Sequence, residues 1–520
     1  MKYVIANFTA GEVSPQALGR IDVENYQNSC RTIENAIVLP TGGVMMVPGT
    51  IYVGQADSSA STILIPWELT PESGALLELN QDNIKVWKND AVVQTLSYPA
   101  GNAYADGDIP AVRAAITNRR GWLCHSGYEV NQLDYDATSG TFSLAKASYT
   151  YTEGGASNPL GLDFATNPPR CAAIYDERLI FANTPNNEKH DRYYGSVVNG
   201  YVSTNLDFSN PDSSGDESNE AFEKVLHAKK RNEILWIATE QALLLGTSYG
   251  VWRVGGPEVI LGTSTGGFPR LQGGVGAADI DAEMLDDLVV FIDRSGRRVH
   301  AVQYIQDADK YVTLDLTFWA EHILGEGAVQ LAFQQTPIHG LWVVREDGSL
   351  AFLSYDRATG LHAWSRIDLG GKVKSIAVLP SAGGEELYFL IERQIDGATV
   401  QYIEKLAPWQ WNSITDAVYL HSAVQVDNGT PLVVTDITAG DSATSTPAQV
   451  TCSTDLDGMN LANDEYVRFA GTGDSLLDGR VFRVKNLNTT NDTFDLYYQD
   501  GTSPVYLDAP LSGLTEASCS

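Results

Sequence analysis

The chain has 520 residues, 43% hydrophobic and 19% charged, which is enough to fold into two or more packed units. Its 65 acidic and 34 basic residues give a formal charge of −31, which argues against a phosphate-binding surface of clustered Lys and Arg. No apolar run approaches the roughly 20 residues of a membrane helix, so no stable membrane insertion is expected. Residues 1–10 lack a small-residue cleavage site, so the chain is expected to fold in the cytoplasm where it is made.

Predicted strands begin near residue 61 and continue to about residue 415. The first hairpin pairs 76–79 with 84–87 across a turn at 81–83. Short apolar or alternating runs, bounded by Gly, Pro, Asn and Asp, recur along the chain, which is typical of all-β proteins. The later predicted strands are 234–239, 243–246, 251–254, 288–292, 299–304, 340–345, 349–355, 362–366, 375–379, 387–392 and 400–404.

Helices are expected to be few, at 22–35, 217–229 and 316–324. Antiparallel meanders with an aromatic residue in many strands favour propeller blades over a sandwich. The Asp347-Gly348 dipeptide between two apolar runs is a strong hairpin signal. Five tryptophans are expected to fill the space between sheets, with carbohydrate stacking as the alternative: Trp67, Trp87, Trp252, Trp342 and Trp364.

A change of composition near Ala417 predicts a domain boundary. From there the sequence is rich in Thr, Asp, Ser and Gly and has only four basic residues, Arg468, Arg480, Arg483 and Lys485. Runs at 449–453, 465–469, 480–484 and 493–498 alternate like strands of a small barrel. The predicted fold class is therefore all-β, with an N-terminal platform or arm segment (1–60), a β-propeller-like core (61–415) and a small acidic β-barrel-like module (416–520).

The cysteines and histidines do not form metal-site patterns. Five cysteines, an odd number, lie far apart without a CxxC pair, so free thiols are predicted for Cys30, Cys124, Cys171, Cys452 and Cys519. None of the eight histidines stands at metal-ligand spacing, and packing or surface positions are expected for His125, His300, His322 and His362. No metal and no cofactor is predicted.

Signals for an enzyme are weak. Ser354-Tyr-Asp356 begins a sialidase-type Asp-box, but its glycine and tryptophan come late, so a hairpin turn is the simpler interpretation. The acidic groups Asp279, Asp281, Glu283 and Asp286-Asp287 could perform acid–base chemistry only if their surroundings drove their pKa values apart, and solvated faces are the simpler interpretation.

Two ligand-loop patterns also fail in detail. The stretch 455–460 imitates a calcium loop, but Tyr466 stands where an EF-hand needs glutamate. Gly274-Val-Gly276 has no surrounding βαβ unit, so it is not a dinucleotide-binding loop. No catalytic, cofactor-binding or metal-binding residue is predicted, and the chain is not expected to be an enzyme.

The order of several short motifs is more specific. The chain opens with Phe8-Thr-Ala-Gly-Glu-Val-Ser-Pro15, Gly19-Arg-Ile-Asp22 and Pro48-Gly-Thr50. Further motifs include Ile65-Pro-Trp67, Leu245-Gly-Thr247, Asp293-Arg-Ser-Gly-Arg297, Asp315-Leu-Thr317, His322, Leu341-Trp342, Ala363-Trp364 and Tyr402-Ile-Glu404. In this order, from residue 8 to residue 404, the chain resembles the tail nozzle family of short-tailed phages (podoviruses), also called tail tubular protein B.

The resemblance implies a structural virion protein in the phage tail, assembled in the host cytoplasm. It implies a homo-hexameric ring below a portal-bound tail adaptor ring, with tail fibre or spike proteins attached. Double-stranded DNA would pass through the lumen of this ring during genome ejection, without sequence-specific binding. Loops projecting into the lumen would form the gate, and 211–219 is a candidate loop because it is long and polar.

Two departures from the family pattern limit what carries over. Met46-Val47 stands where relatives often have a basic pair, so contacts of those cations do not apply here. In relatives, more propeller sequence follows the acidic module, so the closing strands are expected to be absent or to come from another subunit. The alternatives to a nozzle subunit are a carbohydrate-active propeller enzyme and a receptor-binding or fibre-attachment protein that uses the C-terminal module.

Overall fold

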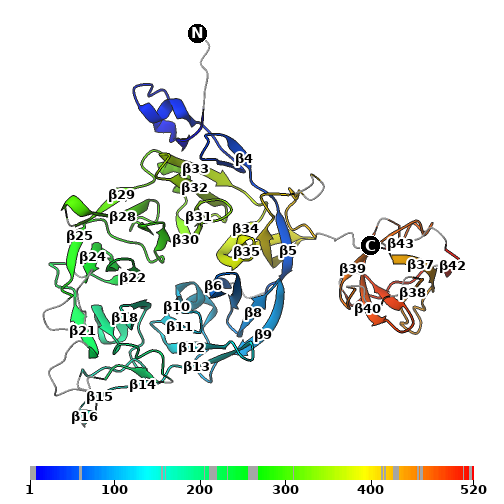
Figure 1. Ribbon diagram of the computed structural model, residues 1–520, viewed down its shortest axis with the longest axis horizontal. Coiled ribbons are helices and arrows are strands. Elements are labelled where there is room, and N and C mark those ends of the chain that lie inside the picture. Colours follow the sequence, from blue (N-terminus) through cyan, green and yellow to red (C-terminus); the bar gives the residue numbers. More distant parts are fainter. Residues whose placement is uncertain are drawn as a thin grey trace. The chain divides into compact units, whose positions relative to one another are not determined.

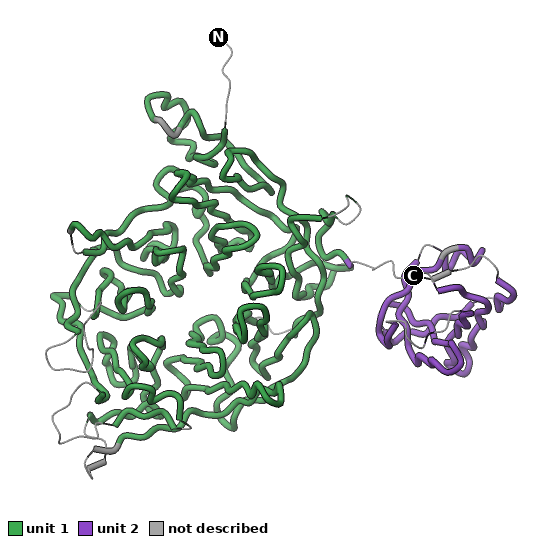
Figure 2. The backbone as a smooth tube through the Cα atoms, in the orientation of Figure 1, with its two compact units in different colours: residues 1–423 green, residues 424–520 purple. Residues whose placement is uncertain are grey.

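The chain forms two compact units, residues 1–423 and 424–520 (Figure 2). The structure, a computed structural model, describes residues 7–519 except for 58–60, 154–155, 158–159, 204, 210–218, 231, 256–266, 309, 412–413, 415–416, 425–431, 454–455, 457–460, 479, 500, 508 and 515–517. Within these residues no helix is long and apolar enough to span a bilayer.

Unit 1 is a β-propeller whose described strands form seven four-stranded antiparallel blades around a central axis (Figure 1). Blade 1 contains β6 (Ile63–Thr70), β7 (Ser73–Leu79), β8 (Asn83–Lys88) and β9 (Ala91–Ser97). Blade 2 contains β10 (Arg113–Ile116), β11 (Arg120–His125), β12 (Tyr128–Asp136) and β13 (Thr141–Lys146). Blade 3 contains β17 (Cys171–Tyr175), β18 (Arg178–Thr184), β19 (Lys189–Gly195) and β21 (Phe222–Val225).

The remaining blades follow in chain order around the ring. Blade 4 contains β22 (Ile234–Thr239), β23 (Leu243–Thr247), β24 (Gly250–Val254) and β25 (Arg270–Gly273). Blade 5 contains β26 (Glu283–Leu285), β27 (Leu288–Ile292), β28 (Val299–Ile305) and β29 (Lys310–Asp315). Blade 6 contains β30 (Ala328–Gln334), β31 (Gly340–Arg345), β32 (Leu350–Asp356) and β33 (Leu361–Ile367). Blade 7 contains β34 (Lys372–Ser381), β35 (Gly384–Ile395), β36 (Ala398–Leu406) and β5 (Thr50–Gln55).

The core of unit 1 lies between neighbouring blades. Middle strands such as β27, Leu-Val-Val-Phe-Ile, are buried along their whole length because other blades cover both faces. Trp236 lies against the backbone of Gly246 in the next strand, where a Cβ atom would come within 1.9 Å of the indole ring. All five tryptophans expected between the sheets are at most 7% exposed, so the packing prediction is confirmed.

Blade 7 is closed by the N-terminal part of the same chain. Strand β5 is the outermost strand and pairs antiparallel with β36, through Tyr402–Gln55 to Leu406–Thr50 (Figure 1). The expectation that the closing strands are absent or come from another subunit is therefore wrong. Because β5 belongs to the propeller, residue 60 does not separate an N-terminal segment from the core.

The segment before β5 is short-stranded. It contains β1 (Gly11–Glu12), β2 (Ser29–Cys30), β3 (Ala36–Val38), β4 (Val44–Met46) and the 3-10 helices η1 (Pro15–Ala17) and η2 (Glu24–Asn28). The other described elements of unit 1 are β14 (Tyr149–Thr150), β15 (Thr152–Glu153), β16 (Ala156–Ser157), β20 (Leu206–Asp207), η3 (Asp106–Ala111), η4 (Pro185–Asn187), η6 (Gln306–Ala308) and η7 (Glu321–Leu324).

The helix predictions are wrong. Among the described residues no α-helix is present: the range 22–35 contains the 3-10 helix η2 and the strand β2, and 316–324 contains the 3-10 helix η7. The predicted helix 217–229 contains β21 instead, because Phe222–Val225 pairs with β19 as the fourth strand of blade 3. Tertiary pairing overrides local helix preference at this position.

Unit 2 is a closed β-barrel. Its strands are β37 (Leu432–Ile437), β38 (Gln449–Cys452), β39 (Tyr466–Ala470), β40 (Val481–Asn488), β41 (Thr493–Tyr497), β42 (Leu511–Ser512) and β43 (Ser518–Cys519). The order β38-β41-β40-β39-β43-β37 closes because β37 also pairs with β38. Inward residues such as Phe469, Phe482 and Phe494 fill the interior, so the barrel prediction is confirmed.

Candidate functional site

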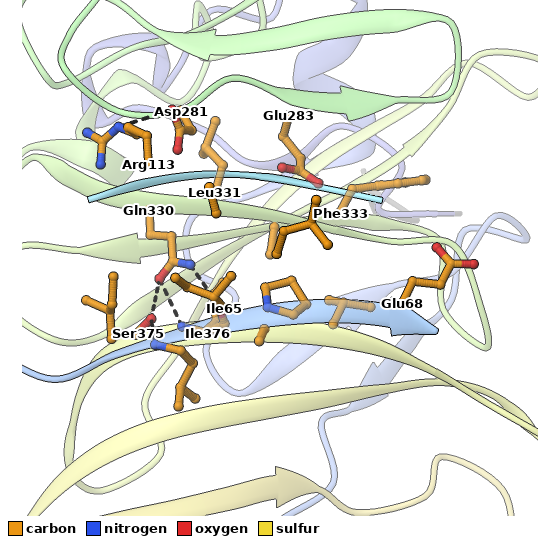
Figure 3. Close-up of a pocket in the computed structure, with 18 of the residues that line it drawn as sticks. Ile65, Glu68, Arg113, Asp281, Glu283, Gln330, Leu331, Phe333, Ser375 and Ile376 are labelled. Carbon is orange, nitrogen blue, oxygen red and sulfur yellow. Dashed lines mark hydrogen bonds and ion pairs between the residues drawn. The ribbon is translucent and has the colours of Figure 1, made fainter. Parts of the chain in front are cut away.

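A cavity of about 1330 Å³ in unit 1 lies between the innermost strands of the blades. The innermost strands β6, β26, β30 and β34 line much of its wall (Figure 3). Its charged lining consists of the carboxylates Glu68, Asp279, Asp281, Glu283 and Glu385 and the cations Arg113 and Lys374. This cavity, called the channel below, brings together three of the acidic residues that the sequence singled out.

Ion pairs join blades across one part of the channel. Arg113, at the start of blade 2, lies 3.1 Å from Asp281 and donates at 2.8 Å to the backbone oxygen of Asp279. Arg170, just before blade 3, contacts the Asp279 carboxylate and lies 3.2 Å from Glu233. The segment leading into blade 5 is thereby tied to blades 2 and 3.

Hydrogen bonds join the innermost strands on the opposite side of the channel. The Gln330 side chain accepts from Ser375 Oγ at 2.9 Å and from the Ile376 N–H at 3.0 Å (Figure 3). Ser375 Oγ in turn accepts from the Leu64 N–H at 3.0 Å. These contacts connect blades 6, 7 and 1, so the polar residues of the channel mainly hold the blades in register.

The pKa values of two channel carboxylates, Asp281 and Glu283, are raised. Burial raises the pKa of Glu283 to about 7, although a hydrogen bond with the Phe333 backbone opposes this rise. Enclosure also raises the pKa of Asp281, against the opposing charge of Arg113, while 56% of its side chain stays open to channel water. Both shifts have the same direction and the same largest cause, which is burial of the carboxylate.

A second cluster attaches the N-terminal segment to blade 6. The Glu12 carboxylate is 1% exposed and contacts His322 Nε2 at 2.8 Å, the Ile33 N–H at 2.8 Å and Arg366 at 3.0 Å. Burial acts to raise the pKa of Glu12, but these hydrogen bonds and the Arg366 charge together lower it. Gly11 has a φ of +66°, and a Cβ atom there would lie 2.5 Å from the backbone nitrogen of Trp364.

A third cluster holds the closing strand β5. Glu404, on β36, is fully buried and accepts hydrogen bonds from Arg393 at 2.6 and 2.7 Å and from Thr50 at 2.5 Å. Thr50 Oγ1 also accepts from the Ser422 N–H at 2.8 Å. A Cβ on Gly49 would lie 2.0 Å from the Leu420 oxygen, so glycine is required.

The signature motifs therefore meet in space. The second cluster unites Gly11-Glu12 with His322 and Trp364, and the third unites Gly49-Thr50 with Glu404. Both clusters consist of buried contacts that join distant segments. These contacts hold distant segments of the fold together.

The remaining sequence candidates lie apart from one another. His125 accepts from the Gly127 N–H, and His300 and His362 have pKa values lowered by burial. Asp286 pairs with His339 and Asp287 with Arg357 at the surface. In the described part of the chain no His, Cys, Asp or Glu cluster fits a metal ion.

Two of the weak sequence motifs lie in a hairpin and in a connection between blades. Residues 354–364 form the β32–β33 hairpin, as predicted for the incomplete Asp-box. Gly274-Val-Gly276 joins blades 4 and 5, and a Cβ on Gly276 would lie 2.2 Å from the Ser248 oxygen. Most of 455–460 and of the gate candidate 211–219 lies outside the described residues. Because the five tryptophans are buried, carbohydrate stacking on them is excluded.

Sequence reasoning missed a group of exposed cations on blades 4 and 5. Lys230 and Arg294 lie 4.8 and 4.9 Å from the Tyr249 ring centroid. The three residues are far apart in sequence and share no motif, and the charge of −31 argued against such a cluster. Net charge does not say where the cations gather.

No protein-family model and no curated protein matches the chain. Several solved structures do. The Pan2 WD40 domain of Neurospora crassa is 9% identical, over 72% of this chain and 97% of that chain, with a TM-score of 0.39. The Cps50 (Swd1) β-propeller domain of Myceliophteria thermophila is 10% identical, over 68% of this chain and 99% of that chain, with a TM-score of 0.41. A streptogramin B lyase is 11% identical, over 67% of this chain and 100% of that chain, with a TM-score of 0.35. The fold class, an all-β protein with a β-propeller-like core as predicted, follows from the strand order of the chain itself.

Proposed function

We propose that this chain is a non-enzymatic structural subunit of a short-tailed phage particle and forms the nozzle ring of its tail. In this proposal six copies surround a gated conduit for genome ejection, below the tail adaptor ring and beside fibre or spike proteins. The DNA passes through the lumen without sequence-specific binding. The subunit acts by shape and assembly, and it needs no cofactor.

The observation that carries the proposal is the ordered series of family motifs from residue 8 to residue 404. Their placement supports it, because the motif residues form joints between distant segments. The Glu12 cluster fixes the N-terminal segment to blade 6, and the Glu404 cluster closes blade 7. A signature made of structural joints fits a subunit whose role depends on shape.

Cryo-electron microscopy of purified virions tests the proposal directly. The expected result is density for this propeller in a continuous ring around the DNA path, below the portal and adaptor. Separate spikes at the periphery of the tail would contradict it and favour the alternative, a receptor-binding or fibre-attachment protein. A glycan-release assay on the purified chain is the control for the enzyme hypothesis, and no turnover is expected.

A further inference from the structure

Two segments carry exposed basic residues near the turn that holds Tyr249, and one cation from each, Lys230 and Arg294, lies over the Tyr249 ring. Lys229 and Lys230 lie in the linker between blades 3 and 4, Tyr249 in the turn between β23 and β24, and Arg294 and Arg297 in the turn between β27 and β28. In antiparallel blades, turns between second and third strands and linkers between blades emerge at the same end of a propeller. These five exposed residues are called the Tyr249 patch.

Tyr249 holds two of the cations close together. The distances of 4.8 Å to Lys230 Nζ and 4.9 Å to Arg294 Cζ mean that at most about 10 Å separates the two charges. A hydrogen bond with Arg294, and then the Arg294 charge, lower the pKa of the Tyr249 hydroxyl. Cation–π attraction thus offsets part of the repulsion between the cations.

The described residues provide no ion-pair partner for the cations of the Tyr249 patch. In the part of the chain that the structure describes, no carboxylate lies within ion-pair distance of these four cations, whereas neighbouring Arg298 pairs with Asp315 at 2.7 Å and Glu321 at 3.2 Å.

Of the described carboxylates on the same segments, Glu233 pairs with a cation outside the patch, whereas Asp293 accepts hydrogen bonds inside the turn between β27 and β28. Glu233 lies 3.2 Å from Arg170, and Asp293 accepts hydrogen bonds from Ser295 Oγ at 2.6 Å and from the Arg297 N–H at 3.4 Å. In an otherwise acidic molecule, the Tyr249 patch therefore remains open to an anionic partner.

We propose that the Tyr249 patch binds the backbone phosphates of double-stranded DNA. Duplex DNA carries one negative charge per roughly 1.7 Å of axis, so the span of the patch faces several phosphates at once. A single strand is a poorer fit, because it needs aromatic rings free for base stacking and Tyr249 is occupied by two cations. The choice of DNA as the polyanion rests on the proposed function, and the contact would slow or hold DNA in the conduit.

The test measures binding of the full-length chain to a labelled duplex of about 30 base pairs by fluorescence anisotropy, from about 50 to 200 mM salt. Binding is expected to weaken with salt, with a log–log slope of about −3 to −4 if all four cations contact phosphates. The double variant Lys230→Glu, Arg294→Glu should bind roughly tenfold or more weakly, with a slope shallower by about 2.

The matched control is Arg119→Glu, Arg357→Glu. Both arginines are exposed and lie in turns between first and second or third and fourth strands, at the opposite end of the propeller, and the change in net charge is the same. The control should bind within roughly twofold of the wild type, because its cations lie outside the contact.

Three outcomes would overturn the inference: no salt-dependent binding by the wild type, equal loss in both double variants, or tighter binding of polygalacturonate than of DNA through the same residues. A virion ring without DNA binding would overturn this inference and leave the proposed function standing. DNA binding by a chain located at the tail periphery would overturn the proposed function alone.

Discussion

Replacing Glu404 by Gln removes the charge at the centre of the blade 7 closure while keeping the size of the side chain. Glu404 is fully buried, and the facing Arg393 side chain is only 9% exposed, so the variant leaves the guanidinium charge without its partner. Removing one member of a buried ion pair costs about 3–5 kcal/mol. We expect the lower end, about 3 kcal/mol, because Arg393 also donates to the Leu369 oxygen at 3.1 Å.

Tryptophan fluorescence during urea unfolding measures this loss in unit 1 alone. All ten tryptophans lie between residues 67 and 411, so unit 2 contributes no tryptophan signal. With a slope of roughly 3 kcal/mol per M, a loss of about 3 kcal/mol lowers the unfolding midpoint by about 1 M. Asp22→Asn is the control, since its ion pair with Arg20 is exposed and screened by solvent, so the unfolding midpoint should stay close to that of the wild type.

A second variant separates the buried charge from general damage to the joint. Arg393→Met with Glu404→Leu replaces the ion pair by apolar side chains and should recover most of the stability lost in Glu404→Gln. The reasoning is refuted if Glu404→Gln stays within about 0.5 kcal/mol of the wild type, or if the apolar double variant is no more stable than the single variant.

Three further predictions concern unit 1. Gly49→Ala should destabilise it by about 1–3 kcal/mol because the new Cβ would meet the Leu420 oxygen, whereas Gly107→Ala, with nothing within 4 Å, should be near neutral in the same urea assay. The folded state lowers the pKa of Glu12, so the stability that its carboxylate contributes is present above about pH 4.5 and is lost as pH falls through the lower folded pKa. The difference in unfolding free energy between the wild type and Glu12→Gln should therefore shrink on acidification, and a constant difference would contradict this. Glu283 has a folded pKa raised to about 7, so the folded state binds a proton that the unfolded state has lost, and wild-type stability should decline as pH rises from about 4.5 to 7. The variant Glu283→Gln should flatten this decline, and an unchanged pH profile of stability would refute the prediction.

Most strands and the fold class can be predicted from the sequence alone. The predicted runs 234–239, 288–292 and 340–345 match the bounds of β22, β27 and β31. Asp347-Gly348 forms the predicted turn, with Gly348 at a φ of +88°. These features depend on residues close together in the chain, because side-chain alternation and turn conformations are local properties.

The features that join distant segments depend on tertiary packing and have no local signal. Closure of blade 7 by β5 depends on pairing with residues about 350 positions later, and no local pattern encodes that partner. The strand at 222–225 and the Tyr249 patch have the same origin, since neighbours supplied by other segments determine pairing and local charge. Periodicity specifies which residues form strands, whereas long-range packing specifies which strands pair and which charges meet.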